Sequence, residues 1–282
     1  MKQKSGKYQK SSRGKSLIRL LAVLLCLSAL LFGGMLFYAV RSQRQFRQLA
    51  RQVHTETAAI TVSPTETATN PAATETTLAP QETETATEAT QPQLLPQYQP
   101  LFEENPDFFG WLTIPDTKID YPVMHSPDDP EKYLHADFDG QYSFAGTPFA
   151  DASCDLESDN ILIYAHNMLD GSMFRSLLNY QEKTYWQKHP AILFNTLYEE
   201  QEYEVLAAFY DRVYYKTETC FKFYQFINAA GEADFDDAIA NFREKSLYDT
   251  GVSAAYGDKL ITLVTCAYHT DNGRFVVVAR RK

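Results

Sequence analysis

Acidic residues are absent from the first 54 positions of this 282-residue chain, and basic residues are absent from positions 55–100. The first segment holds eleven Lys and Arg, and the second holds six Glu. The remaining 182 residues carry 15 basic and 30 acidic side chains, so the net charge of −10 conceals a basic start and an acidic body. Broad nucleic-acid binding needs a basic surface that can face phosphates. The acidic body therefore excludes nucleic acid as an expected partner.

Metal-binding sequence patterns are also missing. The chain contains neither a Cys-x-x-Cys nor a His-Glu-x-x-His spacing, and these are common signatures of zinc sites. We therefore expect no metal and no cofactor. Three cysteines, Cys154, Cys220 and Cys266, lie outside the N-terminal apolar run. Because three is an odd number, at least one of them stays free or pairs between chains.

A long uncharged run extends over 21 residues, from Leu20 to Val40. As a helix it would be about 30 Å long, which matches the hydrocarbon thickness of a bilayer. A cleaved signal peptide is the alternative, but it has a shorter apolar core and a small-residue cleavage site. The stretch GGMLFYAVRSQRQ has no clear Ala-x-Ala site. Seven basic residues precede the run and four follow it. This bias predicts a cytoplasmic segment over 1–19, a single membrane anchor over 20–40 and an extracellular body.

Residues 41–97 are predicted to connect the anchor to the body as a juxtamembrane segment and a disordered stalk. From Thr55 to Gln97 the sequence is rich in Thr, Ala, Glu and Pro and has almost no large apolar side chains. Such a segment cannot bury enough surface to offset the conformational entropy that it would lose on ordering. A flexible coil of about 43 residues reaches roughly 40 Å. We therefore expect the stalk to hold the body off the membrane.

The body, residues 98–282, is rich in short β-biased runs and fits one domain. A short helix is expected before Pro106, and 173–189 has helical spacing. The expected strands are Gly110–Ile114, Asp120–Met124, Asn160–His166, 191–197, 202–215, Leu260–Cys266 and Arg274–Arg280. Many strands joined by short turns and interrupted by a few helices predict a mostly β fold, a mostly antiparallel barrel with inserted helices.

One further helix is predicted over Phe235–Leu247. Its apolar residues recur at i, i+3, i+4 and i+7 and so share one helix face: Phe235, Ala238, Ile239 and Phe242. Acidic residues crowd the start of the segment and basic residues lie near its end, which suits the helix dipole. Gly251 follows as a stop signal.

The last two β-biased runs bring reactive side chains together. Leu260–Cys266 and Arg274–Arg280 are joined by seven residues that end in Asp-Asn-Gly, which is a turn signal. If they pair as a hairpin, Cys266 and Arg274 face each other across its mouth. A fixed positive charge beside a thiol favours the thiolate and can stabilise an oxyanion. The pattern therefore predicts Cys266 as a nucleophile with Arg274 beside it.

A thiolate nucleophile usually works with a proton carrier, and the chain has six histidines. His166 closes the apolar run NILIYAH, and a polar residue at the end of a buried strand is well placed to reach a neighbouring strand end. His269 lies three residues after Cys266. The other histidines are predicted to be superficial or beside the membrane: His54, His125, His135 and His189.

Structural alternatives exist for both residues. A lone cysteine on a strand is most often a small buried hydrophobe, and a lone histidine is most often structural. A disulfide among Cys154, Cys220 and Cys266 is a second alternative. On these readings the chain would be a stalked surface binding module, and thiol labelling of Cys266 would separate that module from an enzyme.

Two stretches resemble a known protein family. NILIYAHNMLDGSMF at 160–174 is followed about 100 residues later by LITLVTCAYHTDNGRFVVVARR at 260–281. They contain a Tyr-x-His-Asn and a Thr-x-x-Thr-Cys pattern, and an amphipathic helix and the lead-in YDTGV…YGDKL lie between them. Together these features resemble the sortases, the cysteine transpeptidases of Gram-positive bacteria, and most of all class B. The resemblance covers about Phe102–Lys282.

The resemblance implies an eight-stranded sortase β-barrel, with an N-terminal helix and a helix in the loop before the catalytic Cys strand. It implies that Cys266 is the nucleophile and carries the acyl group as a thioester. It further implies that His166 is the general acid/base and that Arg274 stabilises the oxyanion. Thr265 is a further candidate for substrate contact.

The resemblance also implies the partners. A sortase at the cell membrane, facing the wall, would cleave a C-terminal sorting signal of secreted proteins and pass the acyl group to an amine of a peptidoglycan precursor. The alternative is a pilus-polymerising enzyme, in which a pilin lysine is the acceptor amine. A membrane-anchored cysteine peptidase, which shares the nucleophile but uses water, is a further alternative.

Overall fold

The computed structural model describes residues 12–62 and 93–282, and the chain divides into two units, Met1–Gln45 and Phe46–Lys282. Helix α1 (Ser12–Val62) begins in the first unit. It contains one stretch, Leu17–Gly34, that is long and apolar enough to cross a membrane. A signal sequence near an N-terminus has the same length and composition, so the anchor over 20–40 stays a prediction.

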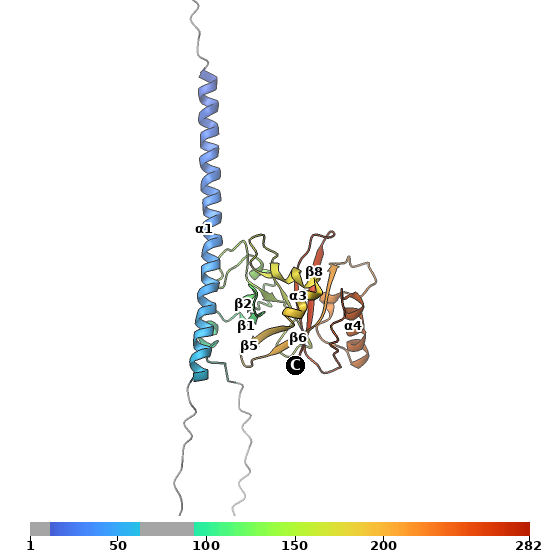
Figure 1. Cartoon of the computed structure of the whole chain (residues 1–282). Helices are drawn as coiled ribbons and strands as arrows, with labels where there is room; N and C mark the ends of the chain where they lie inside the picture. Colours follow the sequence, from blue (N-terminus) through green and yellow to red (C-terminus); the bar gives the residue numbers. More distant parts are fainter. Residues whose placement is uncertain (1–11, 63–92) are drawn as a thin grey trace, which may run out of the picture. The chain divides into compact units, whose positions relative to one another are not determined.

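Within residues 93–282, eight strands close into a barrel in the order β1-β2-β3-β4-β7-β8-β6-β5 (Figure 1). The strands are β1 (Phe108–Thr113), β2 (Asp120–Met124), β3 (Phe149–Ala150), β4 (Asn160–Tyr164), β5 (Ala191–Thr196), β6 (Glu202–Arg212), β7 (Leu260–Cys266) and β8 (Gly273–Arg281). Only the β2–β3 and β4–β7 pairs among these strands are parallel. The predicted mostly antiparallel, eight-stranded barrel is therefore confirmed.

The helices of residues 93–282 lie ahead of β1 or between strands of the barrel. They are α2 (Gln99–Glu104), η1 (Lys132–Leu134), η2 (Phe174–Gln181), α3 (Lys183–Lys188), η3 (Phe223–Gln225) and α4 (Glu232–Lys245). The helical spacing over 173–189 corresponds to η2, which is a 3-10 helix, and to α3. The helix predicted over Phe235–Leu247 corresponds to α4, which begins and ends slightly earlier.

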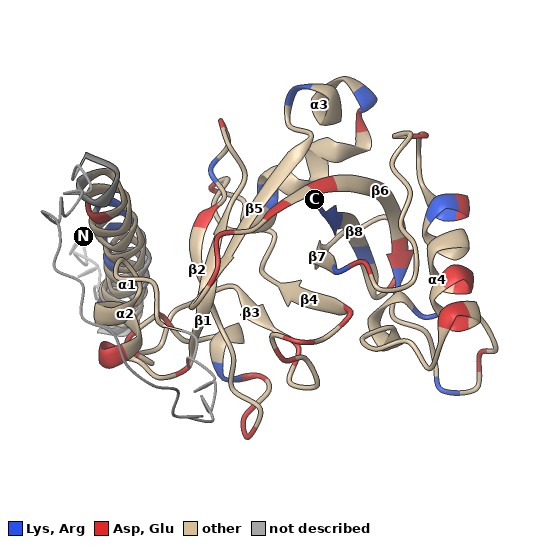
Figure 2. Cartoon of the chain, turned by 90° about the horizontal axis from the view of Figure 1, so that it is seen from below, with Lys and Arg blue, Asp and Glu red and all other residues tan. Residues whose placement is uncertain are grey.

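Most residues of β7 and the central residues of β8 are apolar and buried, because both faces of these strands are covered. Alternate residues of β8 contribute to two different clusters: Phe275, Val277 and Ala279 to the barrel interior, and Val276 and Val278 to a cluster shared with α4. Helix α4 contributes to that cluster the four residues predicted for its buried face. The ribbon of α4 in Figure 2 is coloured red and blue at several other positions, which are its acidic and basic residues.

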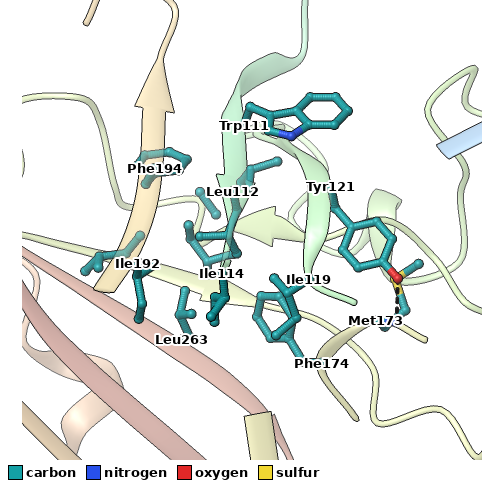
Figure 3. Close-up of a cluster of buried hydrophobic side chains, with 14 of the residues drawn as sticks. Trp111, Leu112, Ile114, Ile119, Tyr121, Met173, Phe174, Ile192, Phe194 and Leu263 are labelled. Carbon is teal, nitrogen blue, oxygen red and sulfur yellow. Dashed lines mark hydrogen bonds between the residues drawn. The ribbon is translucent and has the colours of Figure 1, made fainter. Parts of the chain in front are cut away.

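Large side chains fill the barrel interior. Figure 3 shows residues of this cluster from β1, β2, β5 and β7 close together, with Trp111, Tyr121 and Phe194 among them. The hydroxyl of Tyr121 accepts a hydrogen bond from the backbone N–H of Met173 at 3.2 Å, drawn as a dashed line in Figure 3. This bond ties the segment before η2 to strand β2.

The second half of α1 differs from the predicted stalk. Phe46, Leu49 and Val53 are buried in the barrel's core cluster, and the Phe46 ring meets the Tyr121 ring edge-on at 5.5 Å between centroids. The helix continues to Val62, so the predicted disorder is wrong for residues 55–62. Ala and Glu in this stretch are good helix formers, and the helix ends shortly before a proline, which disfavours helical geometry in the residue ahead of it.

The rest of the predicted stalk divides into two parts. Residues 63–92 lie outside the described residues. Leu94 and Leu95 already pack against the core cluster, and the Leu95 N–H donates to the Leu197 carbonyl at 2.8 Å. The folded body therefore includes residues ahead of the predicted boundary at 98.

Candidate active site

The hairpin predicted near the C-terminus is present. Strands β7 and β8 pair antiparallel, with Cys266 directly opposite Arg274. Both side chains are half-buried. Asn272 adopts a positive φ of 54°, which Asn tolerates better than most residues. A Cβ on the next residue, Gly273, would collide with the carbonyl oxygen of Ala267. The Asn-Gly pair thus permits the tight turn that places Arg274 beside Cys266.

The parallel pairing of β4 and β7 brings His166 to the same end of the barrel. Tyr164 lies opposite Val264. Since parallel strands run in one direction, His166 and Cys266, each two residues further along, emerge together. Two bonds continue the pairing beyond the strands: the Ala165 N–H donates to the Val264 carbonyl at 3.2 Å, and the Thr265 hydroxyl donates to the Ala165 carbonyl at 2.8 Å.

The imidazole of His166 is held by the connection between β2 and β3. Its Nε2 lies 3.0 Å from the carbonyl oxygen of Leu134. Because a carbonyl only accepts, Nε2 carries the proton in this contact, and Nδ1 is the acceptor nitrogen of the neutral ring. Burial lowers the pKa of His166, and the nearby His135 ring contributes in the same direction, while the bond to Leu134 opposes the shift. The neutral imidazole is therefore favoured near neutral pH.

The guanidinium of Arg274 is anchored on its own turn. Its Nη1 donates to the carbonyls of Asn272 at 3.2 Å and Gly273 at 3.0 Å. An arginine carries five N–H donors, so these contacts leave others for a ligand. The turn thus fixes one terminal nitrogen of the guanidinium, and the donors on Nε and Nη2 stay available.

A cavity of about 330 Å³ brings all four predicted site residues together. His166, Thr265, Cys266 and Arg274 line it, together with the apolar and aromatic side chains of Leu134, Phe149, Val213, Phe223 and Tyr224. Its volume falls within the usual range of ligand pockets, about 300–1,000 Å³. The cavity therefore brings a thiol, an imidazole and a guanidinium together beside an apolar wall.

Two carboxylates, Glu131 and Asp151, also line this cavity. The hydroxyl of Tyr164 donates to Asp151 at 3.2 Å. Burial, with the negative charge of Asp151 as a smaller cause, raises the pKa of Tyr164. Tyr164 is therefore a neutral donor, and it orients one wall carboxylate.

Thr265 is placed differently from the other three residues. It is 2% exposed, and its hydroxyl proton is already used in the bond to Ala165. Its role in the structure is to join β7 to the segment that carries His166.

Two histidines that were not predicted as the proton carrier contact other rings. His269 is exposed, lies against the Tyr210 ring at 4.8 Å between centroids, and does not line the cavity. His135 is exposed, as predicted for a superficial histidine, and it also stacks on His166 with 5.5 Å between ring centroids.

The cysteines are not bridged. Cys26, Cys154, Cys220 and Cys266 are all free. Cys154 is 3% exposed, and burial raises its pKa to about 12. Within residues 12–62 and 93–282, no group of three or more His, Cys, Asp or Glu side chains is placed to hold a metal ion.

Asn167 and Arg175 were not among the predicted site residues. Asn167 Nδ2 donates to the carbonyl of Cys266 at 2.9 Å, and Arg175 Nη1 donates to Asn167 Oδ1 at 3.0 Å. The one available signal was that Asn167 directly follows His166. Nothing in the sequence pointed to Arg175.

Comparisons with known proteins agree with this geometry. A family model described as "Sortase domain" matches residues 112–282. The sortase B of Listeria monocytogenes is 36% identical to the chain over 177 residues, which are 61% of this chain and 69% of that protein. A structure of sortase B from Bacillus anthracis shows 29% identity and a TM-score of 0.58, covering 66% of this chain and 83% of that one. A Staphylococcus aureus sortase B–substrate complex shares the fold, with a TM-score of 0.69 at 21% identity, over 87% of this chain and 98% of that one.

Proposed function

This chain belongs to the sortase family as a class B cysteine transpeptidase, and we propose that it acts on secreted proteins that carry a C-terminal sorting signal. The observation that carries the proposal is the single cavity lined by Cys266, His166 and Arg274, which come from three different segments of the barrel. The Staphylococcus aureus relative with the same fold has been solved as a substrate complex. The cavity is large enough for a short peptide segment.

In the proposed reaction, the sulfur of Cys266 attacks the carbonyl carbon of the scissile peptide bond. The neutral imidazole of His166 takes the thiol proton, and the lowered pKa of this histidine favours the neutral form that can accept it. Arg274 donates to the oxyanion of the tetrahedral intermediate. His166 then gives the proton to the leaving amine, the carbon–nitrogen bond breaks, and an acyl thioester remains on Cys266.

The second half of the reaction transfers the acyl group to an amine. An incoming amine loses a proton to His166 as it attacks the thioester carbonyl, and the thiol of Cys266 is released. We propose that the amine belongs to a peptidoglycan precursor, so that the substrate becomes attached to the cell wall. A pilin lysine is the alternative acceptor, and the same cavity chemistry would serve it.

We propose that the enzyme sits in the cell membrane with its N-terminus in the cytoplasm and its barrel facing the wall. The support is the apolar stretch in α1 and the excess of basic residues ahead of it. Both reactants would then arrive at the outer membrane face.

The decisive experiment incubates the full-length protein in detergent micelles with a panel of quenched sorting peptides, with and without amine acceptors. Cleavage that yields an amide product with a peptidoglycan stem-peptide amine supports wall anchoring, and preference for a lysine-bearing pilin peptide supports pilus assembly. The Cys266→Ala variant is the control. Hydrolysis without any amide product when amines are added would indicate a peptidase. A folded protein that cleaves no peptide would indicate a binding module.

A further inference from the structure

The peptide group that follows Cys266 is held from both sides. Its carbonyl oxygen accepts the hydrogen bond from Asn167 Nδ2 at 2.9 Å, and its N–H, which belongs to Ala267, donates to the Gly273 carbonyl at 3.0 Å. A peptide group is planar, so these two bonds fix the backbone angle ψ of Cys266. They thereby fix the backbone from which the thiol projects.

The backbone of Asn167 is secured independently of its side chain. Asn167 forms an antiparallel bridge with Met173, and the carbonyl of the preceding residue, His166, accepts the N–H of Phe174 at 3.0 Å. Asn167 as a whole is 8% exposed, and its side chain points across to Cys266. It is therefore a cross-link between the segment that carries the base and the segment that carries the nucleophile.

Arg175 determines which way the amide of Asn167 faces. A guanidinium has donors and no acceptor, so the amide oxygen must face Arg175 Nη1, 3.0 Å away. The amide nitrogen is then left to donate to the carbonyl of Cys266. In the reverse orientation the amide nitrogen would face the donor Arg175 Nη1, and the amide oxygen would face the carbonyl oxygen of Cys266.

We propose that Asn167, oriented by Arg175, is a positioning residue for the transpeptidation. It sets Cys266 relative to its own neighbour His166 and, through the bond from Ala267 to Gly273, relative to Arg274. The proposal rests on the proposed function, because it assigns Asn167 to the same reaction. A displacement of about 1 Å between reacting groups can cost about 100-fold in rate.

The test compares three variants of the full-length chain. Asn167→Asp keeps the volume and the contact with Arg175 but turns an acceptor toward the Cys266 carbonyl, Asn167→Ala removes both bonds, and Arg175→Gln frees the amide to turn. The matched control is Asn195→Ala on β5. That amide also accepts one bond, from the Gln201 N–H at 3.2 Å, and donates another, to the Tyr98 hydroxyl at 3.0 Å, but it does not line the cavity.

Two readouts separate positioning from stability. We expect both Asn167 variants to lower kcat by about 10- to 100-fold with KM nearly unchanged, and Arg175→Gln to lower it less. We also expect the pH profile of Cys266 alkylation, followed by mass spectrometry of its peptide, to shift in the Asn167 variants and not in the control. A lower melting temperature alone would accompany any lost buried bond.

Parental kcat and a parental alkylation profile in Asn167→Asp and Arg175→Gln would overturn the proposal, whatever their melting temperatures. These two variants keep the test decisive if Asn167→Ala does not fold. The alkylation readout needs no peptide substrate. If the parent cleaves no sorting peptide, the proposed function fails, and an alkylation profile that still shifts would show Asn167 positioning the thiol in a different reaction.

Discussion

His135 and His166 stack ring against ring, with centroids 5.5 Å apart and planes inclined by 29°. His135 also stacks with Tyr142 at 6.4 Å, and the residue before it, Leu134, supplies the carbonyl that holds His166. One connection between β2 and β3 thus supports the proposed base from two directions. Substitutions that move the Leu134 carbonyl or the His135 ring should therefore act on His166.

Acid should destabilise the fold partly through His166. Its pKa in the folded state is lowered below the ordinary 6.5 by burial and by His135. As pH falls through about 6.5 the unfolded chain binds the proton first, so the contribution of the neutral ring to stability is present above that pH and lost below it. We expect the melting temperature to fall more between about pH 7 and pH 5 in the parent than in His166→Gln.

The matched control for this pH series is His269→Gln, which changes an exposed histidine that does not line the cavity. The cavity also contains Glu131, Asp151 and Arg274, which are present in all three proteins. A weaker acid effect in His166→Gln than in both the parent and His269→Gln would assign the effect to His166. Equal acid slopes in the parent and His166→Gln would contradict the assignment.

Replacement of Arg274 by lysine should not be conservative, although it keeps the charge. A guanidinium offers a planar fork that can donate to an oxyanion and to a neighbouring carbonyl together, whereas an ammonium is a point charge. Loss of one oxyanion donor typically costs about 10²–10³ in turnover, roughly 3–4 kcal/mol. We expect Arg274→Lys and Arg274→Ala to lose thioester formation in single-turnover assays while their melting temperatures stay near the parental value.

Arg280→Lys is the control for that experiment, because it makes the same change on the same strand. Arg280 pairs with Glu204 and with the Ser253 carbonyl, away from the cavity. Its turnover should stay parental. Near-parental thioester formation in both Arg274 variants would leave Arg274 as a strand-end residue.

The other two cysteines of the folded body should be dispensable for activity. Cys154 is buried, with its sulfur 3.5 Å from the Leu162 amide nitrogen and 3.6 Å from the Asn160 carbonyl oxygen, whereas Cys220 is exposed. We expect a methanethiosulfonate reagent to label Cys220 and Cys266 in the native protein and to spare Cys154. The Cys154→Ser, Cys220→Ser double variant should keep peptide cleavage, with some loss of melting temperature from the buried hydroxyl. Loss of cleavage in a folded double variant would argue against Cys266 acting alone.

Residues 63–92 should be removable. The chain is held on one side by the buried face of α1 and on the other by the contacts of Leu94 and Leu95. For a disordered segment, which the composition of 63–92 predicts, a change in length alters stability little, about 0.6 kcal/mol for each doubling. A Gly/Ser linker of about 15 residues in place of 63–92 should therefore leave the melting temperature and the turnover nearly unchanged.

Leu49→Ala is the contrasting variant. Leu49 is 8% exposed in the core cluster, and Leu→Ala changes in a core typically cost about 2–5 kcal/mol. We expect its melting temperature to fall clearly. A parental value would mean that α1 does not contribute to the folded body and that residues 63–92 act as the tether.

The predicted membrane orientation can be checked by protease treatment of whole protoplasts. With the N-terminus in the cytoplasm, an external protease should release the barrel as a soluble fragment. A tag placed ahead of the anchor should survive. Loss of that tag with an intact barrel would show the opposite orientation.

Strands and helices with strong local patterns were predictable from the sequence. The buried face of α4 follows from the spacing of Phe235, Ala238, Ile239 and Phe242, and the β7–β8 hairpin follows from two apolar runs around an Asn-Gly turn. Strand β3, Phe149–Ala150, has only two residues. Its pairing is set by β2 and β4, so no local pattern could indicate it.

Contacts between residues far apart in the sequence also limited how much of the site could be predicted. Cys266 and Arg274 are close in sequence, and one hairpin brings them together. The stacking of His135 on His166 depends on how the long connection between β2 and β3 folds over the barrel end. The docking of α1 was missed because the Thr- and Glu-rich composition after Thr55 suggested a coil, while the residues that dock, Phe46, Leu49 and Val53, lie mostly ahead of that composition.

The docking of α1 sets the reach of the enzyme. Five residues, Arg41 to Gln45, separate the end of the predicted anchor at Val40 from Phe46, the first α1 residue of the core cluster. Even fully extended, five residues span less than about 20 Å. With the anchor in a membrane, the folded body would begin within about 20 Å of the lipid surface. Reactants attached to the same membrane would stay within reach of such a short tether, while a reactant released far into the wall would not.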